Sequence, residues 1–423
     1  MTPDPISPAG GRAVANAHAL ARLVGADPML VDILPARDAV PGFTADTILT
    51  SGPTLPWAEY VGGQRAAIIG GALFEGLAAN AADAERRIAE GGISVRGCQE
   101  LGCVGSLAGI YTASMPVFVV RNRDGGNLGF CNIYEGTNRR RLNYGVYDEG
   151  VRDRLRHIGN VVAPVLGAAV RSAGGIALKP IMTSALHMGD DLHSRNTAAS
   201  LLFMRELLPA LLGLAGGDPG GVEKAVRAMT EDHYFFLRLS MAAAKATADT
   251  IKGIERSSVV SAMAFNCKGF SIRVAGLGEQ WFNGPHATVD AVLFEGHTEE
   301  EITWMGGESP ITETVGLGGF AQAAAFPLQK YQGGSPEGMV SRNLSLYDIT
   351  VGEHPDFRIP FLKYRGTPTG IDIFKVLSTG TLPMMNIGIA GRDGGQIGAG
   401  TVRAPLACFS KAAYAYRARY GEG

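Results

Sequence analysis

The amino-acid sequence predicts a multidomain α+β protein, with two α+β domains separated by a mainly helical middle segment. Three observations support this prediction. The chain has 423 residues, which is too many for one ordinary hydrophobic core. Strand-like runs occur towards both ends, whereas the middle has the apolar spacing of helices. Glycine accounts for 58 residues and gathers where loops should be. We therefore expect domains at 1–150, 151–255 and 256–423.

Residues 1–150 are expected to form the first α+β domain. Residues 12–24 have helical spacing that stops at Gly25. The run 66–70 is strand-like and leads into a helical stretch at 73–90. Further strands, where apolar residues run or alternate between glycine turns, are expected at 29–33, 117–120, 128–133 and 142–147.

The middle segment is expected to be mainly helical. Helical spacing runs from Val151 to Val170, Gly174-Gly175 breaks it, and a strand is expected at 176–183. Three helices are expected at 194–214, 220–229 and 231–253.

Strand character returns after Ser257, in the expected C-terminal α+β domain. Strands are expected at 259–264, 270–274, 289–294 and 384–389. Helices are expected at 311–326 and 403–418.

Composition restricts the partners and the location of the protein. The 38 basic and 40 acidic residues nearly cancel, which argues against nucleic acid or an anionic membrane surface as a partner. Apolar stretches are interrupted, as 201–214 is by Arg205 and Glu206, so none reaches the roughly 20 residues of a membrane span. We expect a cytoplasmic homo-oligomer that binds a small polar ligand, needs no cofactor and keeps its five sparse cysteines reduced.

The densest group of chemically active side chains lies at 188–196, directly after an apolar stretch. It contains Asp190, Asp191, His193 and Arg195. Removing these groups from water together is costly unless they are paired or bind something. We therefore take this segment as the candidate catalytic site.

Two other interpretations of this cluster stay open. A helix that begins near His193 would use Asp190 or Asp191 as its N-cap and would attract anions to its free N–H groups. Aspartate and histidine two or three positions apart can also share a metal ion, but the cluster has too few ligands to name one. We assign no metal site.

Two segments near the C-terminal end are expected to bind an anion. Residues 363–372 place hydroxyl and charged side chains on a turn, for which a plain surface turn is the alternative. The loop 386–400 is rich in glycine, so several backbone N–H groups can converge on an anion. The expected ligands are Arg365, Thr367, Thr369, Asp372, Gly394, Gly395, Gln396 and Gly398.

Two glutamates are further candidates for the pocket. Ser309 or Thr312 can cap a helix in which Glu313 is an early residue, which explains Glu313 without catalysis. The alternative is that Glu313 faces the substrate. Glu75, together with residues 51–57, is also expected to line the pocket.

These segments together resemble the YlbE-like family, which includes a subunit of bacterial oxamate carbamoyltransferase. The resemblance extends from about Asn16 to Phe409 and is carried by ordered matches at 105–116, 188–196, 311–319 and 366–372. It implies a multidomain α+β fold with a helical middle, in agreement with the elements above.

The resemblance also implies a reaction and a partner. In anaerobic allantoin breakdown, oxalurate and phosphate are converted to oxamate and carbamoyl phosphate by an assembly that also contains an FdrA-like subunit. We therefore expect a carbamoyltransferase, or a component of one, that acts on a small ureido acid of the oxalurate or oxamate type. The alternatives are a hydrolase of a cyclic amide or ureido compound, and a non-catalytic subunit that binds a ligand.

Carbamoyl transfer needs donors for phosphate, a donor for the carbamoyl oxygen and a group that moves a proton. We assign anion binding to the loop 391–400 with Arg365. Oxyanion donation is assigned to Arg195 or Asn196. Proton transfer is assigned to His193, supported by Asp190 or Asp191.

Overall fold

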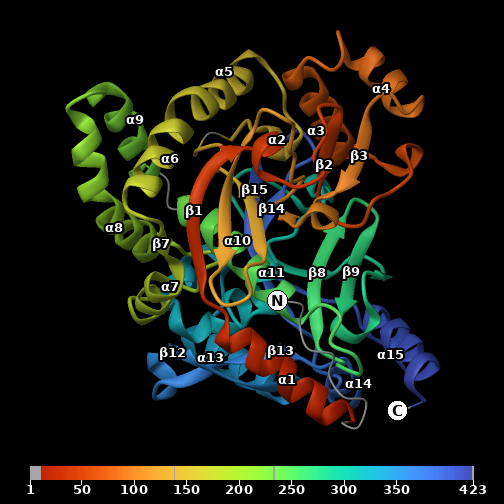
Figure 1. The fold of residues 1–423 in the computed structure, drawn as a ribbon. Helices are drawn as coiled ribbons and strands as arrows, with labels where there is room; N and C mark the ends of the chain where they lie inside the picture. The colour runs from red at the N-terminus through yellow and green to blue at the C-terminus, as the bar shows by residue number, and fades with distance from the viewer. Residues whose placement is uncertain (1–10, 138, 232–233, 422–423) are drawn as a thin grey trace.

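The fold combines many helices with several small sheets, which confirms the predicted multidomain α+β class (Figure 1). The computed structural model describes residues 11–137, 139–231 and 234–421. In Figure 1, α8 (Thr197–Ala215) and α9 (Pro219–Thr230) lie at one side of the molecule, and α15 (Leu406–Tyr420) lies at the opposite side.

The largest sheet has the strand order β4-β6-β5-β1-β7. Strand β1 is antiparallel to both β5 and β7, whereas β4 runs parallel to β6. Helix α10 (Phe235–Ala248) packs against β5 and β6, and α6 (Ala163–Ser172) packs against β1. The strands span Pro28–Pro35 (β1), Cys103–Val104 (β4), Pro116–Asn122 (β5), Leu128–Asn132 (β6) and Ile176–Ala177 (β7).

Four smaller sheets complete the strand structure of the described residues. They have the orders β10-β9-β8, β11-β15-β14, β12-β13 and β2-β3. Six of the strands are Val260–Asn266 (β8), Gly269–Val274 (β9), Phe282–Asn283 (β10), Thr288–Leu293 (β11), Met384–Ala390 (β14) and Gln396–Arg403 (β15). The other four are Thr350–Ile359 (β12), Arg365–Ile371 (β13), Thr47–Thr50 (β2) and Ser94–Gly97 (β3).

The middle of the chain is helical, as predicted. The stretch 151–170 forms α5 (Glu149–His157), a π-helical turn (Ile158–Val162) and α6. Helix α7 (Leu178–His187) follows, and then α8, α9 and α10. The first residues of the helix predicted at 231–253 include positions 232 and 233, which lie outside the described residues.

Helix α8 is long and apolar enough to cross a membrane by length and composition alone. Its Phe203, Leu207 and Leu211 are nevertheless fully buried, and α6, α7 and α9 pack against it. The helix therefore contributes one face to the protein core.

The remaining α-helices precede or follow this middle segment in the chain. Those in the first half are Arg12–Gly25 (α1), Ala36–Ala39 (α2), Gly62–Glu75 (α3) and Ala81–Ala89 (α4). Those in the second half are Ile311–Thr314 (α11), Gln329–Gln332 (α12), Pro336–Ser345 (α13) and Ile373–Thr379 (α14).

Two predicted strands in the first 150 residues are wrong. The run 66–70 lies inside α3, where Gly71 allows a close approach, since a Cβ there would lie 2.8 Å from Ile110 Cγ2. The run 142–147 contains a 3₁₀ turn, Leu142–Tyr144, that ends at Gly145 in the left-handed region. Apolar content alone does not separate a buried strand from a buried helix in such short runs.

Further elements differ from the prediction. The helical stretch predicted at 73–90 is divided between α3 and α4, because Gly76 ends α3 in the left-handed region. The strand predicted at 176–183 is only β7, because α7 begins at Leu178 with Pro180 in its first turn, where proline is tolerated. The helix predicted at 311–326 is broken after α11. Gly316 and Gly318 adopt positive φ angles there, and a 3₁₀ segment, Gly318–Ala324, follows.

The largest core cluster contains buried residues from all three predicted domains, among them Leu30, Leu207 and Val315. A second cluster lies around β8, β9, β14 and α15. The boundaries at 150 and 255 stay predictions, and the segments on either side of them share one core.

Candidate functional site

The loop between α7 and α8 carries the cluster of acidic and histidine side chains. Asp190 Oδ2 accepts a hydrogen bond from Ala199 N at 2.8 Å, and Arg195 Nη1 lies 2.6 Å from Asp190 Oδ1. Asn196 occupies the N-cap position of α8, and its Nδ2 donates to His193 O at 2.8 Å. Asp190, Arg195 and Asn196 therefore hold this loop on the first turn of α8.

His193 is paired with a carboxylate from a distant segment. Its Nδ1 lies 2.7 Å from Glu313 Oε1, and both side chains are buried. The same carboxylate oxygen accepts hydrogen bonds from Gly319 N at 2.9 Å and Asn386 N at 3.1 Å. Thr312 Oγ1 lies 2.9 Å from Glu313 Oε2. The imidazole is thus fixed through Nδ1, and its Nε2 forms no hydrogen bond with a described residue.

Asp191 supports His193 from the other side. Its Oδ1 accepts hydrogen bonds from the backbone N–H groups of His193 at 3.1 Å and Arg195 at 2.8 Å. Its Oδ2 accepts a hydrogen bond from Asn386 Nδ2. Asp191 is fully buried, so its charge acts on His193 with little screening.

The charges in this cluster shift its acid–base properties. Burial lowers the pKa of His193, but Glu313 and Asp191 outweigh burial and raise that pKa above its ordinary value of 6.5. Burial raises the pKa of Asp191, and it raises the pKa of Asp190 to about 6. His193 is therefore able to hold a proton near neutral pH.

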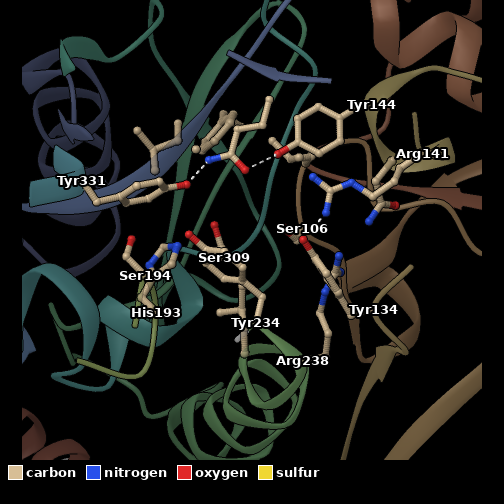
Figure 2. A pocket seen from close by; sticks show the side chains of 17 residues that line it. Ser106, Tyr134, Arg141, Tyr144, His193, Ser194, Tyr234, Arg238, Ser309 and Tyr331 are labelled. Atoms are coloured by element: carbon tan, nitrogen blue, oxygen red, sulfur yellow. Dashed lines mark hydrogen bonds between the residues drawn. The ribbon is translucent and has the colours of Figure 1, made fainter. Parts of the chain in front are cut away.

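His193 borders a cavity whose wall is rich in arginine and tyrosine (Figure 2). The wall includes α10, residues 106–107, Tyr134, residues 141–144, β14 and β15. The lining residues are Ser106, Leu107, Tyr134, Arg141, Asn143, Tyr144, His193, Ser194, Tyr234, Leu237, Arg238, Phe265, Ser309, Tyr331, Ile387, Gly388 and Gln396.

Arg238 brings a positive charge to this cavity from α10, and the residue is 1% exposed. Its Nη1 donates to Asn132 Oδ1 at 2.9 Å. Its Nη2 donates to Asn143 Oδ1 at 2.7 Å in the amide orientation that also lets Asn143 donate to Glu135. Its Nε is buried without a partner among the described residues. Neutral amides thus hold the guanidinium, and no described carboxylate pairs with it.

Arg141 supplies a second buried cation. Its Cζ lies 4.4 Å from the ring centroid of Tyr144 and 5.0 Å from that of Tyr134. Its Nη1 donates to Tyr134 Oη and to Gly136 O, whereas its Nε has no partner in the described part of the chain. Arg238 Cζ lies 5.4 Å from the same Tyr134 ring, so both guanidinium groups contact one aromatic side chain.

The tyrosines of the cavity supply neutral hydroxyl groups. Tyr144 Oη lies 3.2 Å from Gln396 Oε1, and Gln396 Nε2 donates to Tyr331 Oη (Figure 2). Burial raises the pKa of Tyr144, Tyr234 and Tyr331 above the ordinary value of 10. These hydroxyls stay protonated at neutral pH. Tyr144 donates its proton to Gln396 Oε1, whereas Tyr331 accepts from Gln396 Nε2 and can still donate to an anion.

The structure brings together some of the predicted site residues. His193 and Gln396, which are about 200 positions apart, line the same cavity, and Glu313 contacts His193 directly. Gly394 packs on Val146, and Gly395 lies near Arg139 O, so the glycine loop supports the segment that carries Arg141. Gly398 lies on β15 and pairs with Leu293 of β11.

Other predicted site residues lie outside the cavity. Arg365 is half exposed and forms an ion pair with Glu353 at 2.8 Å. Asp372 accepts hydrogen bonds from Asn16 and Ser258 in a separate buried cluster. The side chains of Thr367 and Thr369 pack against Gly316. Glu75 binds the backbone N–H and the hydroxyl of Ser114.

The two cavity arginines were missed in the sequence. Arg141 stands in the run Arg139-Arg140-Arg141, which is typical of a solvated surface. Arg238 gave a usable signal, because it is a lone cation in the otherwise apolar helical stretch 235–244. A buried cation of this kind needs a partner or a ligand.

Comparisons with known proteins decide the family. A family model described as oxamate carbamoyltransferase subunit AllG matches residues 93–309. Oxamate carbamoyltransferase subunit AllG of Escherichia coli (strain K12) is 37% identical over 416 residues, covering 97% of this chain and 99% of that protein. The chain belongs to the AllG family. The predicted family resemblance is confirmed.

Two further proteins are similar to this chain, one by sequence and one by structure. The uncharacterized protein YahG of Escherichia coli (strain K12) is 39% identical over 411 residues, covering 97% of this chain and 87% of that protein. The crystal structure of a conserved protein of unknown function from Enterococcus faecalis V583 superposes with a TM-score of 0.93 at 36% identity. The superposition covers 96% of this chain and 98% of the Enterococcus faecalis chain. The residues matched by the AllG model include His193, Arg141 and Arg238 but end before Glu313.

Proposed function

We propose that this chain provides the carbamoyl-transfer site of an oxamate carbamoyltransferase. The expected substrates are a small ureido acid of the oxalurate or oxamate type and phosphate or carbamoyl phosphate. The observation that carries the proposal is the pair of buried guanidinium groups, each with an unpartnered Nε, in the cavity that His193 borders. Membership of the AllG family, with a relative named as a subunit of this enzyme, supports an enzyme-associated role.

The charge of the cavity favours an anionic ligand. A buried cation without a counter-charge is unfavourable, so Arg238 gains most when an anion enters, whereas Glu135 already favours the charge of Arg141. Guanidinium groups bind carboxylate and phosphate with two parallel hydrogen bonds. Both substrates of the proposed reaction carry such groups. The Tyr331 hydroxyl adds a neutral donor that suits a carbonyl oxygen of a ureido acid.

The proposed step uses His193 as the group that moves a proton. A phosphate oxygen attacks the carbamoyl carbon of oxalurate, the bond from that carbon to the internal nitrogen breaks, and oxamate leaves. Protonated His193 delivers its Nε2 proton to the departing nitrogen, and in the reverse direction neutral His193 removes it. Glu313 stabilises the imidazolium through Nδ1. A guanidinium group neutralises charge that develops on the carbamoyl oxygen.

The test is a product assay with the purified chain. Oxalurate is supplied with and without phosphate, and carbamoyl phosphate, oxamate and ammonia are measured. We expect phosphate-dependent carbamoyl phosphate, and we expect His193→Ala to lower kcat by about 100-fold or more. The matched control is His187→Ala, at an exposed histidine at the end of α7. Phosphate-independent ammonia release would instead identify a hydrolase.

A second candidate is a ligand-binding subunit that is active only in a complex. The word "subunit" in the name of the Escherichia coli relative favours it. In that case the purified chain is inactive until an FdrA-like protein is added, while oxalurate still binds the chain in calorimetry. Activity of the chain alone would exclude this candidate.

A further inference from the structure

Asn386 lies behind the His193 pair and contacts both of its carboxylates. Its backbone N–H donates to Glu313 Oε1 at 3.1 Å, and its side-chain Nδ2 donates to Asp191 Oδ2. Asn386 is 1% exposed, and Asp191 and Glu313 are fully buried. The residue belongs to β14, whose next two residues, Ile387 and Gly388, line the cavity.

We propose that Asn386 is a positioning residue for His193. It holds the Asp191 and Glu313 carboxylates on two sides of the imidazole. The proposal rests on the proposed function, in which His193 moves the proton. Asn386 itself does not line the cavity, so it acts through the two carboxylates.

The orientation of the Asn386 amide is set by a chain of donors that begins at an arginine. Arg342 Nε donates to Gln322 Oε1 at 3.4 Å, and Gln322 Nε2 donates to Asn386 Oδ1 at 2.8 Å. An arginine side chain has only donors, so Gln322 must offer its oxygen to Arg342 and its nitrogen to Asn386. Asn386 in turn must present Nδ2 to Asp191. The direction of each hydrogen bond is therefore fixed by the first.

The donor from Asn386 favours the ionised form of Asp191. A carboxylate that accepts several N–H groups keeps its charge more readily, and Asp191 accepts three, from the backbones of His193 and Arg195 and from Asn386. Burial works in the opposite direction and raises the pKa of Asp191. Loss of the Asn386 donor would raise that pKa further and so favour the neutral form of Asp191.

The state of Asp191 then affects His193. The charged groups that face His193 are Glu313 from α11, Asp191 from its own loop, and Arg141 and Arg238 across the cavity. Tyr144, Tyr234 and Tyr331 share the cavity wall and remain neutral near pH 7. Removal of one of two nearby negative charges should lower the pKa of His193 by about one pH unit.

The test is an NMR titration of the His193 ring, with its signal assigned by comparison with His193→Ala. In Asn386→Leu we expect the pKa of His193 to fall by about one pH unit. In Asn386→Asp the new carboxyl group, when protonated, can donate to Asp191 as the amide does. We therefore expect that variant to keep the His193 pKa at or above the wild-type value.

The control is Asn343→Leu, at another fully buried asparagine with two hydrogen bonds, to Ala323 N and Phe320 O, and no contact with either carboxylate. It should lose similar stability but keep the His193 pKa. An unchanged His193 pKa in Asn386→Leu, with folding verified by circular dichroism, overturns the proposal. The titration needs no turnover. A wild-type chain that transfers no carbamoyl group would therefore contradict the proposed function without changing the result of the titration.

Discussion

The α carbon of Gly318 lies so close to the Glu313 carboxylate that any side chain at Gly318 would overlap Glu313 Oε1. The added Cβ would also lie 2.9 Å from His193 Cβ. Gly318 has a φ of +58° and donates its N–H to Asp191 O at 2.7 Å. The backbone at this glycine therefore sets how closely Glu313 approaches His193.

Gly318→Ala should damage both stability and activity. The positive φ should cost about 1–2 kcal/mol, and overlap with Glu313 should add to this and lower kcat by 10-fold or more. The measurements are thermal unfolding and the carbamoyl-transfer rate. Gly380→Ala is the matched control, because Gly380 has a φ of +71° with open space around its α carbon. It should lose a similar backbone contribution and keep wild-type kcat. Equal activity of the two variants would contradict this prediction.

Glu313→Gln should remove a charge while it keeps the shape of the site. The amide can still accept from His193, and Thr312 Oγ1, which donates to Ser309 O, can accept from the new N–H group. The pKa of His193 should fall, so less imidazolium is present at neutral pH, and kcat for carbamoyl removal should fall by about 100-fold. A pH–rate profile measures this: the alkaline limb should move to lower pH. An unmoved limb would mean that Glu313 does not control the proton on His193.

Arg238→Lys should impair ligand binding. Lysine keeps the charge but loses the planar donor pair, so kcat/KM for oxalurate should fall by about 10- to 100-fold. Arg365→Lys is the control, since Arg365 is half exposed and pairs with Glu353 away from the cavity. Steady-state kinetics and calorimetric binding distinguish the two. Loss of binding in Arg365→Lys but not in Arg238→Lys would place the anion elsewhere.

The contribution of Glu308 to stability should fall as the pH rises from about 4.5 to 7. Glu308 is fully buried, and burial raises its pKa to about 7, although Gly52 N and Gly105 N donate to its carboxylate. A raised carboxyl pKa means that the unfolded state ionises first, so stability falls as pH rises from the ordinary pKa to the folded one. Glu308→Gln should flatten this part of the curve. The difference in thermal unfolding between wild type and Glu308→Gln, followed from pH 4 to 8, measures this contribution, and a difference that does not change with pH would contradict the prediction.

Much of the fold was predictable because many elements show their period clearly in the sequence. Strands β5 and β6 and helices α9 and α15 match their predicted ranges closely. The runs 66–70 and 176–183 misled because short apolar stretches rich in Ala and Ile suit either a strand or a buried helix. In the run 66–70 the helix is favoured by tertiary packing of α3, where Gly71 lies against Ile110. Ile110 is distant in sequence, so no local pattern shows this contact.

The site was predictable in part. His193 and Gln396 carry recognisable chemistry and line the cavity. The role of Arg365 was inferred from its neighbours in sequence, and the fold turns that segment towards Glu353 instead. Arg141 could not be singled out, because its burial depends on tertiary contacts with Tyr134 and Tyr144 that no local pattern specifies.

The guanidinium group of Arg238, which neutral amides hold and no described carboxylate pairs with, opposes folding unless an anion is bound. An anion that binds the folded chain and not the unfolded one would offset the cost of this buried charge and stabilise the native state by mass action, by about 2.7 kcal/mol at 100 times its Kd. The thermal stability of the protein should therefore rise with the concentration of this anion in the cell. A chain starved of ligand should be the first to be cleared by proteases.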